Sequence, residues 1–279
     1  MKLKQLTVIF AIALSLLMTA GFCFAEKVIR AADQREITLG EMIREISGSR
    51  VIFIGEDHDS MMDHWHQIKV MTALNDSAVS FAIGLEMFTS RGQKDLDNWV
   101  AGKMKEEEFV RRYYDNWSEP WSMYRDIFIF AQHHVIPMIG LNLPREVTRK
   151  VATEGFAALN GEERKMIPGT VTCEVDPSYM ALVKRAFAGH GMSDKTFVHF
   201  CEAQMLWNRA MAWNILAYLR RHPDRTLVVL AGKGHAMRPA IPREVLKERA
   251  VDIRVVLPED EVFTHWNLSV ADTDYLFKK

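Results

Sequence analysis

Acidic and histidine side chains follow four short apolar runs in this chain of 279 residues. The polar residues at these positions are Glu56 with His58, Glu86, Asn142 and His235. The carboxyl ends of parallel strands meet at one edge of a sheet, and ligands of open α/β sheets bind at that edge. The pattern therefore predicts one polar site that distant segments of the chain assemble.

Two carboxylates and two imidazoles at one edge allow more than one kind of chemistry. Glu56, His58, Glu86 and His235 could together bind a divalent metal, because carboxylate and imidazole suit zinc, iron or manganese. Without a metal, a carboxylate could orient His58 as the general base of a hydrolase. The structural alternative is that each residue only caps a helix or pairs with a neighbour. Recurrence at several strand ends favours a functional site.

The segments that position these residues indicate an α/β fold. Unbroken apolar runs at 51–54, 80–85, 135–141 and 226–231 are typical of strands covered on both faces. We expect a central, mostly parallel sheet with helices on both faces and a small helical insertion. Helices are predicted at 36–46, after Ser60, at 125–134, 194–221 and 242–249, and closing strands at 251–257 and 262–268.

The helix after Ser60 carries two histidines and a glutamine close together, His64, His66 and Gln67. Met61 and Trp65 are expected on its apolar side. His64 and Gln67 are three residues apart and should share a face, which could look toward the strand ends or hydrogen-bond to the neighbouring helix. His66 is expected to face solvent.

The chain divides into four parts. Residues 1–25 have the charged start, apolar segment and small-x-small cleavage site of a secretory signal peptide, so we expect export to the periplasm or outer cell envelope. Residues 26–144 and 194–279 form the two parts of the α/β core, and 145–193 form the helical insertion. The alternatives for the first segment are an uncleaved membrane anchor or, less favoured because of Phe22, a lipid anchor on Cys23.

Composition narrows the partners and the redox state. The net charge of −1 arises from 35 basic and 36 acidic residues without a long block of one sign, which argues against nucleic acid. Cys173 and Cys201 could pair in an oxidising compartment. Because Cys201 lies in an apolar helical run, we expect a buried free thiol instead.

A set of motifs along nearly the whole mature chain resembles the ChaN family of haem-binding uptake proteins, which is related to the Tiki and erythromycin-esterase-like groups. The motifs are Gly55-Glu-Asp-His58, His64, Gln67, Glu86-Met-Phe88, Gln93 to Gly102, Trp117 with Trp121 and Tyr124, Ile136-Pro137, Asn142-Leu-Pro144, Tyr179, Glu202-Ala-Gln204 with Trp207, and Ala231-Gly-Lys-Gly-His235.

The resemblance implies an exported bacterial protein that binds haem at its surface or between two subunits, with a role in iron acquisition. The second arrangement would require a homodimer. The candidate haem ligands are His64, Tyr179, His190 and His199. In the related esterase-like groups a similar set of strand-end residues performs hydrolysis, so the resemblance also keeps a hydrolase as the alternative.

Overall fold

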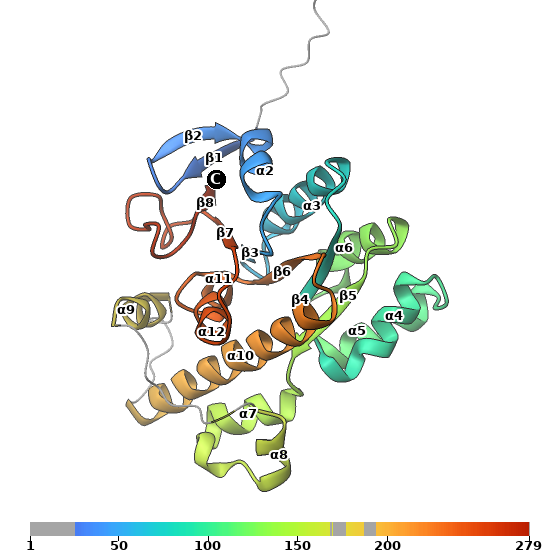
Figure 1. The fold of residues 1–279 in the computed structure, drawn as a ribbon. Helices are drawn as coiled ribbons and strands as arrows, with labels where there is room; N and C mark the ends of the chain where they lie inside the picture. The colour runs from blue at the N-terminus through green and yellow to red at the C-terminus, as the bar shows by residue number, and fades with distance from the viewer. Residues whose placement is uncertain (1–25, 168, 170–176, 187–193, 279) are drawn as a thin grey trace, which may run out of the picture.

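The computed structural model describes residues 26–167, 169, 177–186 and 194–278. The predicted signal peptide, Cys173 and His190 lie outside the described residues. Figure 1 shows a sheet between two groups of helices, with α7 and α8 standing apart from the sheet beside α10.

The strands are β1 (Lys27–Arg30), β2 (Arg35–Thr38), β3 (Val51–Glu56), β4 (Phe81–Thr89), β5 (Met138–Asn142), β6 (Thr226–Gly232), β7 (Ile253–Pro258) and β8 (Tyr275–Phe277). The helices are α2 (Leu39–Ile46), α3 (Met61–Asp76), η1 (Ser90–Gly92), α4 (Gln93–Val100), α5 (Glu106–Asn116), α6 (Trp121–His133), α7 (Arg145–Glu154), η2 (Phe156–Ala158), α8 (Gly161–Lys165), α9 (Pro177–Ala186), α10 (Asp194–Arg221), α11 (Lys233–Ala236) and α12 (Ile241–Glu248).

The described strands form one eight-stranded sheet in the order β2-β1-β8-β7-β3-β6-β4-β5. β1 pairs antiparallel with β2 and β8, and the remaining neighbours pair in parallel. The mostly parallel α/β architecture expected from the sequence is confirmed. Register places Glu56 of β3 beside Gly232 of β6, so the residues that follow both strands are brought to one edge.

Alternation of side chains along each strand divides the core between the two faces of the sheet. Ile52 and Ile54 of β3 pack on one face with α2, α3 and the aromatic side chains of α4–α6. Val51 and Phe53 point to the other face, where α10 and α12 cover the sheet. A smaller core joins α7 and η2 to the first half of α10. The division of the chain at residues 145 and 193 stays a prediction.

Two sequence-based assignments near the ends of the chain are wrong. Residues 36–38 belong to β2, because Thr38 and Glu41 form a capping box that starts the helix at Leu39. Residues 262–268 are turns rather than a strand, since the Asp260 carboxylate accepts from the Val262 and Phe263 amides. The strand that closes the sheet there is β8.

α3 begins after Ser60 as expected, but it turns a different side to the core. Met61 and Trp65 are exposed, whereas His66 is only 4% exposed. His66 stacks on Phe277 at 4.2 Å and lies 3.0 Å from the Glu26 carboxylate. Both partners are far from His66 in the chain, so the expected solvent-facing position is corrected.

Two further findings concern the state of Cys201 and the presence of membrane-spanning helices. Cys201 is buried and disulfide-bonded, which corrects the expected free thiol. Within the described residues, no helix combines the length and the apolar character needed to cross a membrane.

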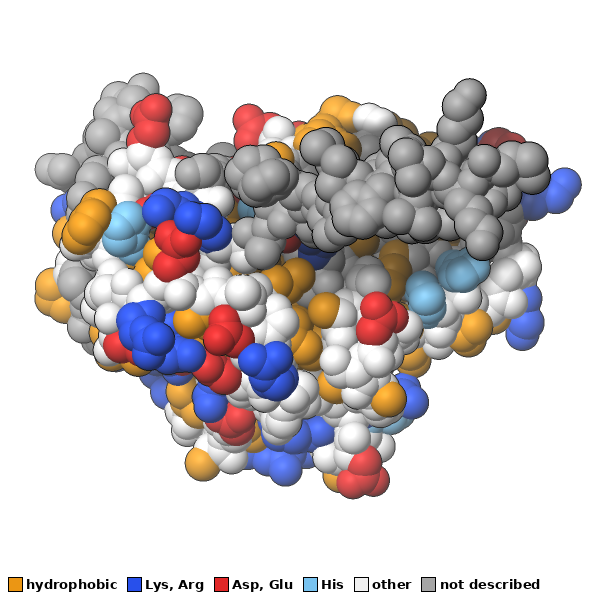
Figure 2. All heavy atoms as spheres, turned by 90° about the horizontal axis from the view of Figure 1, so that it is seen from above, with side chains coloured by type: hydrophobic (Ala, Val, Ile, Leu, Met, Phe, Trp, Pro, Cys, Tyr) orange, Lys and Arg blue, Asp and Glu red, His pale blue; other side chains and the backbone are white. Residues whose placement is uncertain are grey.

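On the face drawn in Figure 2, basic and acidic side chains are interspersed around a central area with hydrophobic side chains.

Candidate functional site at the strand ends

A cavity of about 1190 Å³ opens at the carboxyl ends of β3, β4, β5 and β6. Glu56, His58, Glu86, Asn142 and His235 all line it, so the structure brings together every polar strand-end residue that the sequence singled out. Much of the remaining wall is apolar: Met87, Trp117, Leu143, Trp207, Met237, Val262 and Phe263.

Glu56 is a fully buried carboxylate with partners on both oxygens. Oε1 accepts from the Tyr124 hydroxyl at 2.5 Å and lies 2.8 Å from Nδ1 of His58. Oε2 accepts from the Gln67 amide at 2.7 Å and lies 3.5 Å from Nε2 of His64. The shared face of His64 and Gln67 is therefore confirmed, and its role is to hold this carboxylate.

Glu56 and His58 form an ion pair. Burial opposes the charge of Glu56, but hydrogen bonds from His58 and His64 outweigh it and lower the pKa of this carboxyl to about 2. Burial likewise opposes the charge of His58. The hydrogen bond to Glu56 and the charge of Glu86 prevail and raise the pKa of His58 to about 9. At neutral pH the pair is carboxylate with imidazolium.

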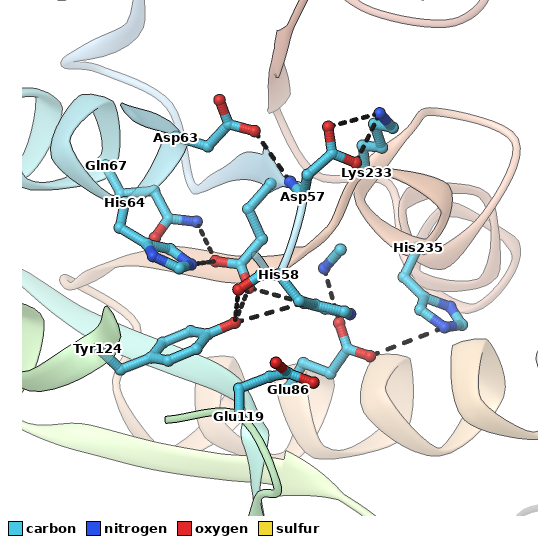
Figure 3. A network of polar contacts seen from close by, with 12 residues as sticks. Asp57, His58, Asp63, His64, Gln67, Glu86, Glu119, Tyr124, Lys233 and His235 are labelled. Carbon is cyan, nitrogen blue, oxygen red and sulfur yellow. Dashed lines mark hydrogen bonds and ion pairs between the residues drawn. The ribbon is translucent and has the colours of Figure 1, made fainter. Parts of the chain in front are cut away.

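Glu86 lies between His58 and His235 in Figure 3. Its Oε2 accepts from the Gly232 amide at 2.7 Å, and its Oε1 lies 3.8 Å from Nε2 of His235. Gly232 must lack a side chain, because a Cβ there would lie 2.9 Å from Cε1 of His58. The turn after β6 thus lets both histidines approach one carboxylate.

His235 differs from His58 in its protonation. Its Nδ1 lies 2.7 Å from Oδ1 of Asn208, a contact that fits the tautomer with the proton on Nδ1 and a lone pair on Nε2. Burial is the main reason that the pKa of His235 is lowered, and the nearby charge of Glu86 only partly opposes it. One cavity therefore holds a charged and a neutral imidazole.

Lys233 connects the site to the loop after β7. Its ammonium lies 2.6 Å from the Asp57 carboxylate and also pairs with Asp260. The ammonium is 4.8 Å from the centre of the Phe263 ring, which forms part of the cavity wall. This lysine ties residues 260–263 to the end of β3.

The expected haem ligands have different positions. Tyr179 lines the cavity, but its hydroxyl donates to the Gly234 carbonyl at 2.7 Å, and burial raises its pKa to about 12. His64 is buried behind Glu56 and does not line the cavity. His199 lies 3.1 Å from the Thr153 carbonyl and is not in the wall either. His190 is outside the described residues.

The metal alternative depends on how the four predicted ligands are arranged. In the described part of the chain, no group of three or more His, Cys, Asp or Glu side chains is placed to hold a metal ion. Both oxygens of Glu56 and Oε2 of Glu86 already accept hydrogen bonds, so a shared metal centre gains no support.

Sequence reasoning missed some residues that complete the site. Tyr124, named above only among the motifs of the family resemblance, is buried with its hydroxyl on Glu56. Asn208 orients His235, and the visible signal was a polar residue in an otherwise apolar helix. Asp260 had no local signal, because its partner Lys233 is far away in the chain.

The fold and the site define an α/β protein with a large ligand cavity at its strand ends. The sequence profile of the family described as haem-binding uptake, Tiki superfamily, ChaN matches residues 42–245. The chain therefore belongs to this family. No curated protein sequence matches the chain.

Among solved structures, the chain is similar to ChaN of Campylobacter jejuni, described as binding haem cofacially, with a TM-score of 0.71 and 19% identity over 90% of this chain and 96% of that one. It is also similar to a mutant of the erythromycin esterase EreC in its open conformation, with a TM-score of 0.50 and 13% identity over 78% of this chain and 72% of that one. At these identities the similarity shows the shared fold.

Proposed function

We propose that this protein binds haem in the strand-end cavity and serves haem or iron acquisition outside the cytoplasm. Membership of the haem-binding uptake family and the cofacial haem of the Campylobacter jejuni protein support the ligand class. The observation that carries the proposal is a cavity of about 1190 Å³ with a largely apolar wall and an available imidazole. Small-molecule pockets are commonly about 300–1,000 Å³, so this cavity has room for a ligand at the large end of that class.

His235 is the iron ligand that this geometry favours. A neutral imidazole ligates haem iron, and its other ring nitrogen is usually held by a hydrogen bond. His235 meets both conditions through Asn208, whereas His58 is protonated and Tyr179 donates its hydroxyl proton to a carbonyl. When bound, haem supplies an iron centre that this imidazole can coordinate.

Titration with haemin tests the proposal. The wild-type protein should develop a saturable Soret band, and His235→Ala should shift or abolish it and weaken binding by about tenfold or more, since mutation around a metal site commonly costs 10–100-fold. Tyr179→Phe should change the band little. The matched control is His133→Ala, which removes an exposed histidine at the end of α6.

Two results would count against this assignment. A wild-type protein without a saturable band removes haem binding as the function. A band in His235→Ala with the wild-type position and affinity keeps haem binding but excludes His235 as the ligand.

A second candidate function is hydrolysis, favoured by the opposite pKa shifts of the two histidines beside Glu86. When the pKa values of two groups in one site are shifted in opposite directions, one group can act as an acid and the other as a base. The direction of the shifts moves the base role from His58, where the sequence placed it, to His235. In this proposal His235 takes a proton from water, and the His58 imidazolium, held by Glu56, stabilises the oxyanion of an ester.

Release of p-nitrophenol from a p-nitrophenyl ester measures this activity. His235→Ala and His58→Ala should each lower kcat/KM by about 100-fold or more, as removal of a general base or an oxyanion donor does. His133→Ala should have no effect. Ester cleavage that is unchanged in both active-site variants would exclude the hydrolase.

Export of the protein is part of the proposal. Its support is the signal-like composition of residues 1–25. Association of two chains and attachment to a membrane stay predictions.

A further inference from the structure

One side of α7 lies along the cavity. The cavity-lining residues of this helix are Arg145, Thr148, Arg149 and Ala152. Their spacing of three and four positions is that of a single helical stripe. Val147 and Val151, on the other side of the helix, pack in the small core against α10. On this side, α7 therefore forms the cavity wall with two short side chains and two guanidinium groups.

The two guanidinium groups on this stripe have no acidic partner among the described residues. Within the described residues, Arg145 donates to the hydroxyl of Ser118 at 3.0 Å, and Arg149 makes no side-chain hydrogen bond or ion pair. The adjacent Glu146 also lines the cavity, but it is bound by Arg91 at 2.8 Å. Arg145 is the first residue of α7, where the helix dipole disfavours a cation. Two like charges one turn apart also repel.

The acidic groups in the cavity are engaged deeper inside. Glu56 and Asp57 pair with His58 and Lys233. Glu86 accepts from the Gly232 amide and lies near His235. The charge of Glu119 acts on His58, whose pKa it helps to raise. The α7 side of the cavity therefore keeps an excess of positive charge next to an apolar interior.

We propose that Arg145 and Arg149 bind carboxylates carried by a ligand whose remaining surface is flat and apolar. Guanidinium groups form charge-assisted, often bidentate hydrogen bonds with carboxylates. Thr148 and Ala152 add only short side chains to the cavity wall beside these arginines, and Trp207 adds an aromatic wall from α10. Resting on the proposed function, this inference assigns the two propionates of haem to α7 and makes the free acids the basis of ligand selection.

The test compares haemin with its neutral dimethyl ester. The variant Arg145→Gln/Arg149→Gln should bind haemin about tenfold or more weakly, because two charge-assisted contacts are lost. Its affinity for the dimethyl ester should stay within about twofold of the wild-type value, since the ester lacks the charges that these contacts need. The matched control, Arg111→Gln/Arg243→Gln, removes the same charge from two exposed arginines outside the cavity.

The outcomes separate this inference from the proposed function. Wild-type affinity for haemin in the α7 double variant overturns the inference alone. Equal weakening toward haemin and its ester also overturns it, because that pattern reports general damage to the pocket. A wild-type protein that binds neither compound overturns the proposed function and the inference together. Circular dichroism and thermal unfolding of each variant establish that it is folded.

Discussion

Glu56 shows how one buried charge organises the centre of the site. The carboxylate contacts His58, His64, Gln67 and Tyr124 from three different elements. A buried charge is tolerated only while such partners remain, and removing one partner leaves the other uncompensated. The orientation of His58 in the cavity is therefore tied to the ionisation of Glu56.

This ion pair predicts a defined pH dependence of stability. The pKa of His58 is raised from its ordinary value of 6.5 to about 9, so its contribution is complete below pH 6.5 and is lost as pH rises through 9. The pKa of Glu56 is lowered from 4.5 to about 2, so its contribution is complete above pH 4.5 and is lost as pH falls through 2. The pair stabilises most between pH 4.5 and 6.5.

His58→Gln should therefore destabilise the protein most at pH 6. Because 37% of the His58 side chain is exposed and solvent screens it, we expect a loss of about 1–2 kcal/mol in the free energy of unfolding. The loss should shrink toward zero above pH 9. Urea unfolding at pH 6, 8 and 10 measures it, with His133→Gln as control. A pH-independent difference would show that packing, rather than charge, is what the substitution removes.

At this scale the sequence predicted the residues but not their partners. Glu56, His58, Glu86 and His235 follow strands, and parallel pairing alone brings them together. The contact of Tyr124 with Glu56 depends on how α6 packs against α3, which no local pattern encodes. For the same reason the pKa of His58, and with it the choice of base, could not be predicted from spacing.

Among the elements, α6 ends in a Schellman motif that contains an unfavourable residue. The Ile136 amide donates to the Ala131 carbonyl at 2.8 Å, and the Val135 amide to Gln132 at 3.2 Å. Val135 lies between them with φ of 54°, a left-handed conformation that a β-branched residue rarely adopts. Its side chain is 69% exposed, so little packing offsets the strain.

Val135→Gly should stabilise the protein by about 1 kcal/mol, because glycine adopts the left-handed conformation without steric cost. The increase should appear as a higher midpoint of thermal or urea unfolding. The comparison variant is Val135→Ala, which keeps a Cβ and should gain less. A glycine variant less stable than the wild type would contradict this account of the helix end.

Elements with a strong hydrophobic pattern were predicted well. Segments whose backbone conformation is fixed by side-chain hydrogen bonds were not. α10 spans Asp194–Arg221 as expected, because its length and apolar content allow only a buried helix. The alternation in residues 262–268 resembles a strand, but Asp260 and Asn267 hold the backbone in turns. Such loops depend on individual polar contacts rather than on periodicity.

For the whole molecule, the first prediction concerns export. The described structure starts at Glu26, whose carboxylate lies 3.0 Å from His66 and 2.7 Å from Lys69. Cleavage after Ala25 would leave these contacts intact. Mass spectrometry of protein recovered from the cell envelope should give a chain that starts at Glu26. A chain that still carries residues 1–25 would contradict cleavage of the signal peptide. A Cys23→Ser variant with unchanged fractionation would exclude lipid attachment.

The order of the strands has a consequence for how such a chain matures. β1 reaches the rest of the sheet only through β8, which lies between β1 and β7. The hairpin of β1 and β2 therefore cannot pair with the rest of the described sheet until residues 275–277 have been synthesised. A polypeptide emerging from a ribosome therefore cannot complete this border of the sheet before its last strand has been made.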